Sequence, residues 1–156
     1  MRPAIVALVA ALFATGCTAA AAAPAPAPAA VSAALPDAPL LASEGGVLRP
    51  IDNGGRVAMK GGYAEVRFTP SPQSMDPQLQ VSLFDPAGQP RTADVSVEWE
   101  SLDMDHGTDS ATGSLREGCY RMRLSFAMPG SWRLKVHVTG SGAEEIVTLV
   151  LPWVGL

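Results

Sequence analysis

Apolar and polar residues alternate along several short segments of this chain, which is typical of β-strands with one buried face. In the segment 93–101, Val95, Val97 and Trp99 fall on one face, and the residues between them are Ser and Glu. The same pattern predicts further strands at 57–59, 63–69, 79–84, 119–128, 132–138 and 146–153. The last of these is apolar on both faces, which is typical of a strand that is covered on both sides.

Turn sequences separate these segments, and none of the segments has the apolar repeat of a helix. Asp-Pro-Ala-Gly at 85–88 follows one predicted strand, and Pro-Gly at 129–130 follows another. About seven short strands within residues 47–156 predict an all-β domain, an immunoglobulin-like two-sheet β-sandwich.

The first residues have a different pattern. Arg2 precedes an unbroken apolar run at 4–14, and small residues then lead to Cys17. This is the layout of a secretory signal, and its apolar core is too short to span a bilayer as a stable helix. We therefore predict that residues 1–16 are a signal peptide.

The sequence Ala-Thr-Gly-Cys at 14–17 resembles the lipobox of bacterial lipoproteins. In those proteins the cysteine of the lipobox is acylated and becomes the first residue of the mature protein. The resemblance implies a membrane-anchored protein of the bacterial cell envelope, facing the periplasm or the exterior. Thr18 is not Asp, which resembles the pattern of outer-membrane sorting in a Gram-negative organism. An ordinary secretory signal cleaved within 19–23 is the alternative, and the protein would then diffuse freely.

Residues 17–46 are predicted to be a disordered linker that begins with the lipidated cysteine. Pro24, Pro26 and Pro28 alternate with alanines, a spacing that favours extended polyproline-like geometry over a helix. The folded domain is then expected at 47–156, a size that supports a core of its own.

Charge and cysteine content restrict the possible functions. The formal net charge is −4, and no basic cluster of the kind that binds nucleic acid is present in the sequence. The chain has two cysteines. If Cys17 is acylated, Cys119 has no partner for an internal disulfide.

Several short motifs fall between residues 81 and 138: Leu-Phe-Asp-Pro-Ala-Gly at 83–88, Met-Asp-His-Gly at 104–107, Gly-Cys-Tyr at 118–120 and Phe-Ala-Met-Pro-Gly-Ser-Trp at 126–132. Together they resemble the YtkA-like and FixH-like families of small bacterial β-sandwich proteins. The resemblance implies a periplasmic or surface-exposed domain, often in copper-handling or oxidase-assembly settings. The membrane helix expected at the start of FixH proteins is missing from this sequence, so the YtkA-like family fits better.

Met104 and His106 are the candidate metal ligands, because thioether and imidazole groups suit copper and residues at i and i+2 point the same way on an extended segment. Cys119 is a candidate third ligand if its strand starts at the same end of the sandwich. Met128 would then lie about 30 Å from Cys119, so we expect it in the core. The alternatives are an ordinary polar loop with a packed Met and a solvated His, and a lone cysteine or an intermolecular disulfide at Cys119.

Met128 and Trp132 both face inward, which predicts a three-residue connection between the strands that they end and begin. In that register, His137 lies across from Arg123, a neighbour that disfavours a bound cation. We expect the outward side chains of this hairpin to form a solvated basic face, paired with the glutamates of 93–101 if that strand lies alongside. The members of this face are Arg121, Arg123, Arg133, Lys135 and His137.

Enzymatic motifs are not apparent in the sequence: we find no phosphate-binding loop, nucleophile elbow or paired-His zinc motif. We therefore expect a non-enzymatic accessory or binding protein of the envelope, with copper as its possible ligand. The alternative is a structural protein–protein interaction module without metal chemistry, which would dock on an envelope partner through a face of the sandwich.

Overall fold

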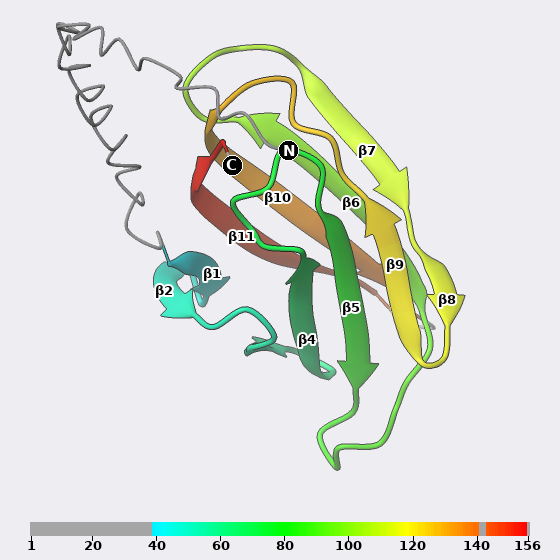
Figure 1. Cartoon of the computed structure of the whole chain (residues 1–156). Coiled ribbons are helices and arrows are strands. Elements are labelled where there is room, and N and C mark those ends of the chain that lie inside the picture. Colours follow the sequence, from blue (N-terminus) through cyan, green and yellow to red (C-terminus); the bar gives the residue numbers. More distant parts are fainter. Residues whose placement is uncertain (1–38, 141–142, 156) are drawn as a thin grey trace, which may run out of the picture. The chain divides into compact units, whose positions relative to one another are not determined.

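The computed structural model describes residues 39–140 and 143–155. These residues form two antiparallel sheets packed face to face (Figure 1), so the predicted all-β sandwich is confirmed. The predicted signal peptide, Cys17 and most of the predicted linker lie outside the described residues. No described helix is long and apolar enough to cross a membrane.

Eleven strands are described. In chain order they are β1 (Leu40–Glu44), β2 (Val47–Ile51), β3 (Arg56–Met59), β4 (Gly62–Thr69), β5 (Gln78–Phe84), β6 (Asp94–Ser101), β7 (Thr108–Thr112), β8 (Ser114–Arg116), β9 (Cys119–Arg123), β10 (Gly130–Thr139) and β11 (Glu144–Val154). One sheet has the order β2-β1-β11-β10-β6-β7, and the other has the order β3-β4-β5-β9-β8. We call them the six-stranded and the five-stranded sheet.

The core between the sheets is entirely apolar among the described residues. Strand β6 shows why: Val95, Val97 and Trp99 are buried, whereas the Ser and Glu residues between them are partly exposed. Strand β10 alternates in the same way and pairs with β6, so that Leu134 lies opposite Trp99. The inward faces predicted from alternation therefore form the core.

The folded part begins earlier than predicted. Residues 40–46, expected to belong to the linker, instead form β1 and the turn of the β1–β2 hairpin, and β1 pairs with β11. Leu40 and Ala42 are buried in the core. Gly45 and Gly46, which resemble linker residues, adopt positive φ angles in a tight hairpin turn.

Two further strands, β7 and β8, carry no alternating apolar signal because most of their residues are exposed at the sheet edges. The predicted strand 119–128 is too long, since β9 ends at Arg123. The prediction that 146–153 is covered on both faces is also wrong: β11 alternates, and Ile146 is 52% exposed.

Candidate metal-binding site

The segment 102–107, which we call the Met104 loop, joins β6 to β7 at one end of the sandwich (Figure 1). Strand pairing places Thr108 opposite Glu100, so the chain must reverse within these few residues. The Ser101 hydroxyl accepts the backbone N–H groups of Asp103 and Met104 at 3.2 and 3.3 Å. The side chain of Ser101, the last residue of β6, therefore holds the start of the loop.

Strand β10 fixes the loop from the other side. The N–H of Leu102 donates to the Ser131 carbonyl at 2.9 Å, and the N–H of Ser131 donates to Asp103 Oδ2 at 2.7 Å. A Cβ atom at Gly130 would lie 2.6 Å from the same Asp103 oxygen and would displace it, and the φ of 148° at this position also favours glycine. The Pro-Gly sequence at 129–130, predicted as a turn, thus anchors the Met104 loop.

Met128 lies at the same end of the sandwich as the Met104 loop, contrary to the expectation that it stands far from Met104 and His106. The chain leaves the sheet after Arg123, and the residues that follow are held by side chains of the six-stranded sheet. Trp99 Nε1 donates to the Ser125 carbonyl at 3.2 Å, and Trp132 Nε1 donates to the Met128 carbonyl at 3.3 Å. Alternation predicts which face a residue occupies, but not where its strand ends.

Two soft donor groups of the Met104 loop are available to a ligand. The Met104 side chain is 52% exposed, and His106 is exposed and makes no hydrogen bond to any described residue. Residues 100–108 line an open hollow of about 370 Å³. Met128, at the same end, is half-buried and packs against the core, as expected from the sequence.

The carboxylates beside this hollow are already engaged. Glu100 accepts a hydrogen bond from Arg133 Nε at 2.8 Å and lies 3.5 Å from Lys135 Nζ. The bond and charge of Arg133, helped by Lys135, hold the pKa of Glu100 below its ordinary value despite partial burial. Asp103 accepts the N–H of Ser131, and Asp105 Oδ1 accepts the N–H of Gly107 at 3.4 Å.

The donor side chains of the Met104 loop that make no hydrogen bond to a described residue are a thioether and an imidazole. Within the described residues, no group of three His, Cys, Asp or Glu side chains converges in a way that could hold a metal ion. The thioethers of Met104 and Met128 fall outside that count, and thioether with imidazole is a ligand set that suits copper(I). These residues fit copper(I) by chemical type.

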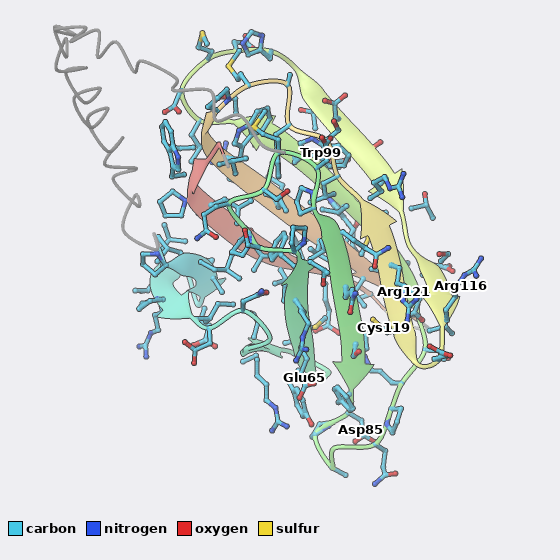
Figure 2. The ribbon with its side chains drawn as sticks, viewed as in Figure 1. Glu65, Asp85, Trp99, Arg116, Cys119 and Arg121 are labelled. Atoms are coloured by element: carbon cyan, nitrogen blue, oxygen red, sulfur yellow. The ribbon has the colours of Figure 1, made fainter. Side chains whose placement is uncertain are left out.

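Cys119 is not brought together with Met104 and His106. Strand β7 runs back along β6 to Thr112, which lies opposite Ser96, and β8 and the β8–β9 turn follow. Cys119 therefore lies at the other end of the strands, opposite Arg116. Figure 2 shows Cys119 with Arg116 and Arg121 at that turn, well away from Trp99. The prediction that Cys119 lies at the same end as Met104 and His106 was wrong. It did not include β7 and β8, which carry the chain to the other end before β9 begins.

The predicted basic hairpin does not form, because β9 and β10 belong to different sheets. His137 lies opposite Ser96 and Ile146 rather than Arg123. Its Nδ1 is 2.7 Å from Glu144 Oε1, and its Nε2 is 3.6 Å from Glu98 Oε2. The expectation that the glutamates of β6 neutralise the cations of β10 is confirmed by these contacts and by the Glu100 pairs.

These observations define a two-sheet antiparallel β-sandwich with an exposed Met/His loop at one end. The model of the YtkA-like family matches residues 58–137, and the chain belongs to this family. The match extends from β3 into β10 and includes the Met104 loop. No curated protein and no solved structure matches the chain.

Proposed function

We propose that this YtkA-like protein is a non-enzymatic accessory protein of the bacterial cell envelope that binds copper(I) at the Met104 loop. The observation that carries the proposal is the exposure of Met104 and His106 on one loop, with Met128 at the same end. Each of the neighbouring carboxylates accepts a hydrogen bond from Arg133, Ser131 or the loop backbone, whereas the side chains of Met104 and His106 make no hydrogen bond to any described residue.

Each residue has a defined part in this proposal. Met104 and Met128 supply thioether sulfur, which is neutral and polarisable and therefore favours a soft monovalent ion. His106 supplies the lone pair of a neutral imidazole nitrogen. The hydrogen bonds that Leu102 and the Asp103 side chain make with Ser131 hold the loop beside the segment that carries Met128.

A copper(I) titration of the reduced protein against a competing chelator tests the proposal. The variant Met104→Leu/His106→Gln keeps the side-chain volumes but removes both donors, and we expect its affinity to fall at least tenfold, or about 1.4 kcal/mol. The matched control Met59→Leu/His137→Gln removes the same residue types elsewhere and should keep the wild-type affinity. Micromolar or weaker binding that the loop variant leaves unchanged would contradict the proposal.

The envelope location rests on the sequence, in which an apolar segment precedes Cys17 in a lipobox-like setting. We propose that acylated Cys17 anchors the protein to the membrane, since several acyl chains together give stable attachment. Cells fed radiolabelled palmitate should label the wild-type protein, and Cys17→Ser should abolish the label and move the protein to the soluble fraction. Equal labelling of both proteins would overturn the anchor.

A further inference from the structure

The outer face of the five-stranded sheet carries arginines that have no acidic partner. Strand pairing places Arg67, Gln80 and Arg121 in one row across β4, β5 and β9. Arg123 lies opposite Gln78 in the neighbouring row, and Arg116 lies opposite Cys119. Arg67, Arg116 and Arg123 are exposed and make no ion pair with any described residue. We call these three residues the unpaired arginines.

The two sheets differ in this respect. On the six-stranded sheet, Arg133 and Lys135 both contact Glu100, and His137 lies between two glutamates. Among its described residues, only Arg49, on the edge strand β2, is a cation without an ion pair. The five-stranded sheet carries five arginines, of which two pair with Glu65 and Glu117 and three have no ion pair, although the whole chain has a formal net charge of −4. Three of the four strand arginines without an ion pair therefore share one face of an acidic protein, which favours an anionic surface as its partner.

This face lacks the features of a typical protein-binding site. None of the large hydrophobic side chains that are exposed in the described residues projects from it; Leu115 of β8 pairs with buried Tyr120 and points to the inner side. Its aromatic pair, Tyr63 stacked on Phe84, is half-buried, and Arg56 lies over the Tyr63 ring. Protein interfaces usually depend on a buried aromatic or apolar centre, whereas a layer of phosphates requires only guanidinium groups that can reach it.

We propose that the unpaired arginines dock the domain on an anionic phospholipid surface, the bilayer in which the proposed Cys17 anchor is embedded. This inference rests on the anchor part of the proposed function and is independent of copper. The chain between Cys17 and the start of β1 is 22 residues long. A chain of that length can reach at most about 70 Å. A tether of that length allows the face to reach the bilayer, and tethering makes a weak contact effective.

Vesicle partition tests this inference without copper and without acylation. The full chain carrying Cys17→Ser is mixed with vesicles of phosphatidylcholine alone or of phosphatidylcholine with phosphatidylglycerol, and the ratio of the two partition coefficients is measured. The apolar segment near the N-terminus contributes to both coefficients, so the ratio reports charge. Each arginine near an anionic bilayer strengthens binding about fivefold, so Arg67→Gln/Arg116→Gln/Arg123→Gln should lower the ratio on the order of 100-fold.

The control Arg49→Gln/Arg133→Gln/Lys135→Gln removes the same number of positive charges outside this face and should leave the ratio within a few-fold of the wild-type value. A ratio near one for the wild-type chain, or equal losses in both triple variants, would overturn the proposal.

Soluble polyglutamate is a second probe. If it binds the wild-type chain more tightly than the anionic vesicles do, and the unpaired-arginine variant loses that binding, the partner is an acidic polypeptide and the membrane proposal is wrong. Failure here leaves both the palmitate label at Cys17 and the copper titration unaffected.

Discussion

At the scale of single residues, Arg91 and Glu145 form an ion pair whose side chains are only 24% and 18% exposed. Glu145 Oε1 accepts Arg91 Nη2, and Glu145 Oε2 accepts the N–H of Gly61, each at 3.0 Å. Burial alone would raise the pKa of Glu145, but the hydrogen bonds from Gly61 and Arg91, together with the Arg91 charge, lower it overall. The pair connects the start of β11 to the β3–β4 turn.

A lowered pKa in the folded state means that ionised Glu145 stabilises the fold above the pKa of the unfolded chain. This contribution is lost as the pH falls through the folded value. We expect Glu145→Gln to lower the free energy of unfolding by about 1–3 kcal/mol at neutral pH. The difference from wild type should shrink at acidic pH, as protonation of the Glu145 carboxyl in the folded protein removes its charge. Urea denaturation at neutral and acidic pH measures the free energy of unfolding of both proteins. A difference between them that does not change with pH would contradict the argument.

Glu65→Gln is the matched control for this prediction, because Glu65 pairs with Arg56 on the surface, where the Arg56 side chain is 66% exposed. Surface pairs contribute about 0–1 kcal/mol, so the control should remain close to wild type.

At the scale of elements, the strands with a strict apolar alternation could be located from the sequence, and the edge strands could not. Strands β4, β5, β6 and β10 have one buried and one polar face, and this difference is visible in the residue order. Strands β7 and β8 are held mainly by backbone pairing to a neighbour, which leaves no such pattern. The β1–β2 hairpin was missed because β1 is short and is followed by two glycines.

The β1–β2 hairpin yields a direct test of the domain boundary. A chain that starts at residue 39 keeps β1, whereas a chain that starts at 47 exposes the β11 edge and removes Leu40 and Ala42 from the core. Loss of a buried leucine alone costs about 2–5 kcal/mol. The shorter chain should therefore unfold at a clearly lower urea concentration. If it does not fold at all, its amide NMR signals should show the narrow dispersion of an unfolded chain. Equal stability of the two chains would show that β1 is dispensable.

At the scale of the whole domain, Met104 and His106 could be named from the sequence as candidate ligands, whereas Met128 was expected only in the core. The arrangement of these residues depends on strands that the sequence did not predict. Met104 and His106 share a loop because they are neighbours in the chain. The separation of Cys119 follows from β7 and β8, and the position of Met128 follows from the early end of β9. Long-range geometry of this kind is set by which strands pair, and alternation does not encode that choice.

The position of Cys119 leads to a prediction at this scale. Cys119 lies at the end of the sandwich opposite the Met104 loop, and its Sγ is 3.6 Å from the backbone carbonyl of Tyr120. Cys119→Ser should therefore leave the copper(I) affinity of the reduced protein within about twofold of wild type. A tenfold loss in chelator competition would assign the copper to the thiol instead.

The most direct test of the proposed site is an NMR measurement of the methionine methyl groups while copper(I) is added to the reduced protein. Coordination through sulfur changes the shielding of the attached methyl group, so each methionine reports on its own involvement. We predict that the Met104 and Met128 signals shift with saturation at one equivalent, while those of Met59 and of buried Met122 stay in place. Unmoved Met104 and Met128 signals in a chain that has taken up copper would contradict the proposed site.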